Sequence, residues 1–96
     1  MTPQRLKPTI AKAMVPGWNA ETHPREIISK TFVFPNFAGA IQWMVNVSRE
    51  AERLNHHPEW LNIYDRVEVV LTTHDAGGVT MLDVDLAKFM NAAADK

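Results

Sequence analysis

A single apolar stripe of helical spacing between Pro35 and Pro58 restricts the fold more than any other feature of the sequence. Asn36 precedes the stripe as an N-cap residue type, and the restricted backbone before Pro58 ends it. The stripe predicts a helix of about 18 residues with one apolar face, formed by Phe37, Ala40, Ile41, Met44, Val47, Ser48, Ala51 and Leu54. Polar side chains fall on the other side of this helix, as expected for a helix that lies on a sheet.

Two segments on either side of this helix alternate in the manner of β-strands. Ile27–Phe34 and Arg66–Thr73 are rich in β-branched and aromatic residues, and their side chains point alternately to two faces. Two weaker candidates accompany them. We expect a strand and a turn within Asn19–Glu26 and a short extended segment at Trp60–Tyr64.

The two ends of the chain carry helical patterns. Gln4–Met14 has helical spacing, but Pro8 lies inside it and should confine the helix to the C-terminal part. After the turn at residues 75–78, Thr80 and Asp83 match a capping box, and apolar residues then recur at helical spacing to the C-terminus. The order α-β-β-α-β-β-α with short connections predicts an α+β fold, in which the helices pack on one face of a four-stranded antiparallel sheet.

Length and composition exclude several classes of protein. A chain of 96 residues with 46% apolar side chains suits one domain over residues 1–96. The net charge of -1 disfavours binding to nucleic acid. There is no cysteine for a disulfide or a thiolate ligand. The N-terminus lacks the apolar core of a signal peptide, and no apolar run is long enough to span a membrane, so we expect an intracellular, cytoplasmic protein.

Three of the four histidines lie where two predicted elements end. His56 and His57 follow the long helix, and His74 follows the Arg66–Thr73 strand. Imidazoles at a helix C-terminus are often capping groups, and a histidine after a strand is often a turn residue. The functional alternative is proton transfer near neutral pH. Glu52 lies four residues before His56, so helical geometry predicts that the carboxylate contacts and orients this imidazole.

These residues occur together in a pattern that resembles a known family. The sequence reads Glu52-x3-His56-His57-Pro58-x5-Tyr64-x9-His74-x8-Asp83. This spacing resembles the signature of the pterin-4a-carbinolamine dehydratases, and the similarity extends from about Leu6 to Ala92. Asn55 is a departure, because many members carry aspartate there.

The resemblance implies a reaction and a set of site residues. The family removes water from 4a-hydroxytetrahydropterin to give quinonoid dihydropterin, which recycles tetrahydrobiopterin without a metal or another cofactor. The step needs an acid and a base, and histidine can supply either at neutral pH. By resemblance His56 and His74 are the proton-transfer pair and Glu52 orients the site. The implied substrate-binding residues are His57, Trp60, Thr72, Thr73 and Asp83. Trp60 could equally be a packing aromatic, and Asp83 a capping residue only.

Two other interpretations remain open from sequence. The first is a non-catalytic oligomeric interaction protein, of the transcriptional coactivator or assembly factor type. The second, a three-histidine metal site, is disfavoured because adjacent histidines diverge and no i, i+4 pair is present. A small core and the resemblance both predict a homodimer or a homotetramer.

Overall fold

The computed structural model describes residues 3–95 and confirms the predicted class and order of elements. The chain forms, in order, α1 (Pro8–Ala13), β1 (Asn19–Glu21), β2 (Ile27–Val33), α2 (Phe37–Leu54), β3 (Glu59–Ile63), β4 (Arg66–Leu71), the 3-10 turn η1 (His74–Ala76) and α3 (Met81–Ala94). The strands form one antiparallel sheet in the order β1-β2-β4-β3. Within residues 3–95, no helix is both long enough and apolar enough to cross a membrane.

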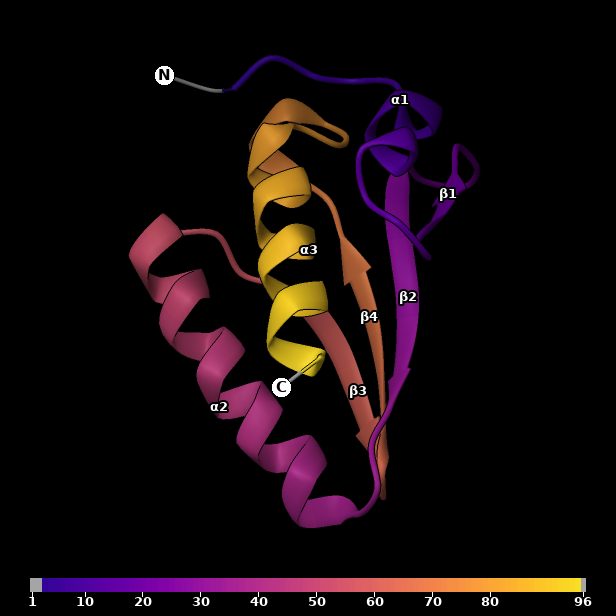
Figure 1. Cartoon of the computed structure of the whole chain (residues 1–96). Coiled ribbons are helices and arrows are strands. Elements are labelled where there is room, and N and C mark those ends of the chain that lie inside the picture. The colour runs from indigo at the N-terminus through magenta and orange to yellow at the C-terminus, as the bar shows by residue number, and fades with distance from the viewer. Residues whose placement is uncertain (1–2, 96) are drawn as a thin grey trace.

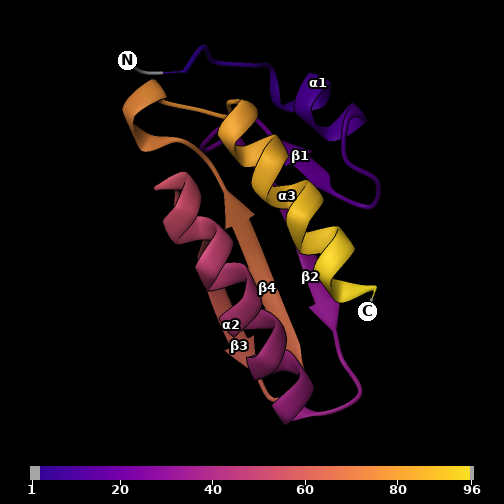
Figure 2. The same cartoon turned by 60° about the vertical axis from the view of Figure 1, so that its left-hand side comes forward.

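The helices α2 and α3 lie side by side on one face of the sheet (Figures 1 and 2). Strand β4 shows why this face is the core, since Val67, Val69 and Leu71 are buried while the alternating residues are half-buried. The indole nitrogen of Trp43 in α2 donates a hydrogen bond to the carbonyl oxygen of Met90 in α3 at 3.1 Å. This bond joins the two helices above the sheet.

The boundaries of α2 match the prediction, but its buried face differs from the predicted stripe. The Asn36 side chain accepts a hydrogen bond from the Gly39 amide at 2.8 Å, which caps the first turn. Trp43, which lies off the predicted stripe, is buried, while Phe37 and Ile41 on the stripe are exposed. The reason is packing, because the Trp43 ring fits against aromatic side chains of the sheet.

The strands near the site begin and end slightly earlier than predicted. Strand β3 starts at Glu59 instead of Trp60, and β4 ends at Leu71 because Thr73 instead forms an isolated bridge with Gly78. Helix α1 begins at Pro8, as the effect of proline on helices predicts. Together these elements bring the end of α2, the end of β4 and the start of α3 to one end of the molecule (Figure 1).

Candidate active site

His56 leaves the end of α2 through a left-handed turn. Asn55 has φ 50° and ψ 45°, and the His56 amide donates to the carbonyl oxygen of Ala51 at 2.9 Å. Asparagine is one of the few residues other than glycine that adopt this backbone conformation readily. The turn carries the imidazole into the interior, where His56 is only 8% exposed.

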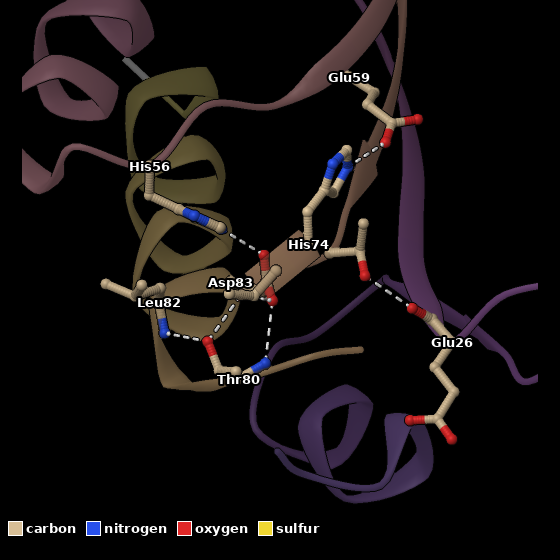
Figure 3. Close-up of polar contacts among 9 residues, drawn as sticks. Glu26, His56, Glu59, His74, Thr80, Leu82 and Asp83 are labelled. Atoms are coloured by element: carbon tan, nitrogen blue, oxygen red, sulfur yellow. Dashed lines mark hydrogen bonds and ion pairs between the residues drawn. The ribbon is translucent and has the colours of Figure 1, made fainter. Parts of the chain in front are cut away.

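Asp83, in the first turn of α3, holds this imidazole (Figure 3). Its Oδ1 atom lies 2.5 Å from Nε2 of His56, and its Oδ2 atom accepts hydrogen bonds from the Thr73 hydroxyl at 2.8 Å and the Thr80 amide at 2.9 Å. The predicted capping box is therefore confirmed. Because carboxylate oxygens accept hydrogen bonds, the contact favours the His56 tautomer with its proton on Nε2.

The structure places Asp83 behind His56 and away from solvent. The residue is completely buried, so its carboxyl group is accessible from the cleft only through the imidazole that it holds. The buried carboxyl group has hydrogen-bond donors at both oxygens, which offsets the cost of removing it from water. Asp83 is thus able to fix the orientation of His56 from beneath.

His74 lies at the other side of the same end of the molecule. It opens η1 after β4, and its side chain is 74% exposed. Its Nε2 atom lies 3.1 Å from Oε2 of Glu59, the first residue of β3 (Figure 3). Arg25, from the loop between β1 and β2, donates to both Glu59 oxygens at 2.9 Å. The hydrogen bond from Arg25, and then that from His74, lowers the pKa of Glu59 to about 2.

The prediction that Glu52 contacts His56 is wrong. Its Oε2 atom lies 2.5 Å from Nε2 of His57 instead, and both side chains are more than half exposed. The i, i+4 argument assumed that the helix continues to His56, but the left-handed Asn55 ends it and turns His56 away from Glu52. The exposed Glu52–His57 pair can orient His57 at the surface, where solvent weakens the attraction.

All three histidines of the predicted site line one cleft of about 700 Å³. The lining residues come from the N-terminal segment, the end of α2, the end of β4 and the start of α3: Pro3, Leu54, Asn55, His56, His57, Thr72, Thr73, His74, Asp75 and Leu82. Trp60 is not among the described residues that line it. Its ring packs near Trp43, with 6.1 Å between ring centroids, under the helices.

The two threonines of the predicted site use their hydroxyl groups within the protein. The Thr72 hydroxyl donates to the carbonyl oxygen of Glu26 at 2.9 Å, and the Thr73 hydroxyl donates to Asp83. The Thr73 amide donates to the carbonyl oxygen of Gly78 at 2.8 Å. These bonds fix the end of β4 and thereby the wall of the cleft beside His74.

Sequence reasoning missed Glu59 and Arg25. A signal for Glu59 was available, because antiparallel pairing places it opposite Val70, on the face of β4 that also carries Thr72. Arg25 comes from a polar loop whose position relative to β3 depends on the complete sheet order. No local pattern in the sequence predicts that contact.

A second hollow of greater volume lies away from this histidine cluster. Among residues 3–95 no group of three His, Cys, Asp or Glu side chains is arranged to hold a metal ion. The larger hollow, of about 860 Å³, lies between α2 and α3 beside Phe34, Trp43 and Phe89, and its lining contains no histidine. The cleft that carries acid–base side chains is therefore the candidate site.

Comparison with known proteins identifies the family. The sequence profile described as "Pterin 4 alpha carbinolamine dehydratase" matches residues 1–93. The chain belongs to this family. A Rhodopseudomonas palustris protein named "Putative pterin-4-alpha-carbinolamine dehydratase" is 58% identical over 80 residues, covering 83% of this chain and 78% of its own length. A Bordetella avium protein of the same name is 50% identical over 91 residues, covering 94% and 82%.

Two solved structures share the fold of this family member. A transcriptional coactivator/pterin dehydratase from Brucella melitensis has a TM-score of 0.88 and 41% identity, and the match covers 95% of this chain and 99% of that one. A pterin dehydratase-like protein, identified as a RuBisCO assembly factor in the alpha-carboxysome, has a TM-score of 0.68 and 19% identity over 81% and 89% of the two chains. The second likeness concerns the fold alone.

Proposed function

We propose that the protein dehydrates 4a-hydroxytetrahydropterin to quinonoid dihydropterin and so recycles tetrahydrobiopterin. The supporting observation is that two imidazoles from different elements, His56 and His74, line one cleft, and each has a carboxylate at Nε2. Membership of the dehydratase family supports the same reaction.

The chemistry needs two proton transfers and no change in oxidation state. One histidine donates a proton to the departing 4a-hydroxyl, which leaves as water, and the other accepts the proton from the pterin ring nitrogen. The proton thus lost from the ring balances the proton gained by the leaving group. Each well-placed acid or base typically contributes about 10²–10⁴ in rate.

The remaining residues act around this pair. His57 is exposed in the cleft and binds the pterin, with Glu52 orienting its ring. Thr72 and Thr73 shape the wall of the cleft. Asp83 acts through His56, because its carboxyl group is buried.

Stopped-flow turnover of chemically generated 4a-hydroxytetrahydropterin tests the proposal. The spontaneous dehydration must be subtracted, since it sets a floor for every variant. We expect His56→Ala and His74→Ala each to lower kcat by about 10²-fold, and the double variant to lose less than the product of the two. Wild-type protein that does not exceed the spontaneous rate would refute the proposal.

A second candidate function is an oligomeric interaction protein. The observation that favours it is an exposed apolar row on α2. The row is formed by Phe37, Ile41 and Val45, which follow one another at intervals of four residues along the helix. Such rows are typical of surfaces that bind another protein or another subunit. Light scattering of the wild type and of Ile41→Glu tests it, and a monomer in both cases would contradict it.

A further inference from the structure

A three-residue contact holds His74 at the mouth of the cleft. Its members come from separate parts of the chain: Arg25 from the β1–β2 loop, Glu59 from the start of β3 and His74 from η1. Arg25 binds both carboxylate oxygens of Glu59, which fixes that carboxylate in one orientation. One of the same oxygens then contacts Nε2 of His74.

His74 needs such a contact because little else holds its ring. The side chain is 74% exposed, whereas the His56 side chain is 9% exposed and packed above Asp83. His74 also lines a second, smaller hollow of about 460 Å³, together with Arg25, Gly77 and Gly78. An exposed ring that borders two hollows samples several rotamers unless a partner selects one.

We propose that Glu59 is a positioning residue for His74, and that Arg25 holds Glu59 in place for this purpose. The effect on catalysis rests on the proposed dehydratase function, whereas the positioning of the His74 ring by Glu59 does not depend on that function. The contact selects the rotamer in which Nε2 faces Glu59 and Nδ1 is the nitrogen left for proton transfer with the pterin.

The surrounding charges are consistent with this role. Glu59 remains ionised at every pH at which a histidine transfers protons, because its pKa lies at about 2. The other nearby glutamate, Glu26, points its carboxylate away from His74 (Figure 3), and this carboxylate lies 3.8 Å from Nε of Arg5. Glu59 is thus the carboxylate that the structure places against the His74 ring.

A simpler explanation is that Glu59→Ala acts only through the loss of an exposed ion pair on the sheet. The Arg66–Glu68 pair of strand β4 provides a matched control for that explanation. Glu68 lies on the adjacent strand β4, forms a 3.3 Å ion pair, and is 45% exposed, compared with 42% for Glu59. Its Oε2 atom accepts a hydrogen bond from Nε of Arg66, and the pair involves no histidine.

The test measures the rotamer of His74 and the turnover of the same variants. Three-bond couplings from Cγ of His74 to its backbone nitrogen and carbonyl carbon report whether χ1 is fixed or averaged. We expect fixed couplings in the wild type and in Glu68→Ala, and averaged couplings in Glu59→Ala and, to a smaller extent, in Arg25→Ala. In stopped-flow assays Glu59→Ala should lower kcat about 10-fold with KM unchanged, a part of the contribution of one acid–base group. Glu68→Ala should retain wild-type kcat.

Each outcome decides the inference. Couplings in Glu59→Ala that equal those of the wild type would overturn it, as would averaged couplings with kcat within twofold of wild type. Glu59→Gln keeps one acceptor oxygen and should fall between the wild type and Glu59→Ala. If the wild type has no dehydratase activity, the proposed function fails, and the couplings alone decide whether Glu59 positions His74.

Discussion

Replacing Asp83 with asparagine tests the link between α3 and the candidate site most directly. Asparagine has nearly the same shape, so packing around this buried position is retained. Its carbonyl oxygen can accept the two hydrogen bonds from Thr73 and Thr80 that Oδ2 now accepts. Its amide group then faces Nε2 of His56 and presents donors where the carboxylate presented an acceptor.

The size of the effect follows from this single reversed contact. A hydrogen bond to a charged group contributes about 1.5–3 kcal/mol, and a change of the His56 tautomer recovers part of it, which leaves a loss of about 1–2 kcal/mol. For a domain of this length that loss lowers the Tm by about 4–16 °C. The tautomer change moves the proton of His56 to Nδ1, so this nitrogen no longer accepts a proton. We expect kcat to fall about 10²-fold.

Thermal unfolding and stopped-flow turnover of Asp83→Asn check both values. Thr80→Ala is the control, because it removes the hydroxyl that caps α3 at Leu82 but keeps the contact between His56 and Asp83. The control should lose about 1 kcal/mol of stability with kcat close to wild type. If Asp83→Asn and Thr80→Ala show the same kcat, His56 does not depend on Asp83 for catalysis and the reasoning is refuted.

Three further predictions follow from individual contacts. Because the pKa of Glu59 is lowered to about 2, its stabilisation is present above the unfolded value of about 4.3 and is lost as pH falls through the folded value. Urea unfolding of Glu59→Gln should differ from wild type by less than about 1 kcal/mol at pH 6, and the difference should shrink as the pH is lowered toward 2. Asn55→Ala should lose about 1 kcal/mol at its left-handed backbone while Asn55→Gly loses none, and equal melting temperatures for the two variants would contradict this. His57→Ala should raise KM and leave kcat within a few-fold, since a positioning contact acts in both ground and transition state; an equal fall in kcat and kcat/KM would show that His57 takes part in the chemical step.

The elements of the fold could be predicted because each has a local cause. Alternation over β2 and β4 is visible in the residues themselves, and α2 begins at the side-chain cap of Asn36 and ends before Pro58, both of which act locally. The buried face of α2 could not be predicted equally well. Burial of Trp43 depends on the aromatic rings of Phe32 and Phe34, which reach it only after the sheet has formed.

In the candidate site, too, some features could be predicted from the sequence and others could not. The histidines were found from their positions at the ends of elements, and all three line one cleft. The predicted partner of His56 was wrong, and no partner was predicted for His57 or His74. The contact between His56 and Asp83 spans 27 residues, and that between His74 and Glu59 spans 15. Spacing rules for a single helix cannot predict contacts that depend on tertiary packing.

Asp83 shows that a structural role and a role in the site can belong to one residue. As a capping residue it needs one oxygen for the Thr80 amide, and that oxygen is Oδ2. The second oxygen, Oδ1, would be costly to bury without a donor, and the His56 imidazole supplies one. The capping box therefore holds the carboxyl group in a fixed direction. Because the buried Oδ1 atom requires a hydrogen-bond donor, it selects the orientation in which His56 supplies one. Sequence reasoning treated these two roles as alternatives, but the geometry makes the first a condition of the second.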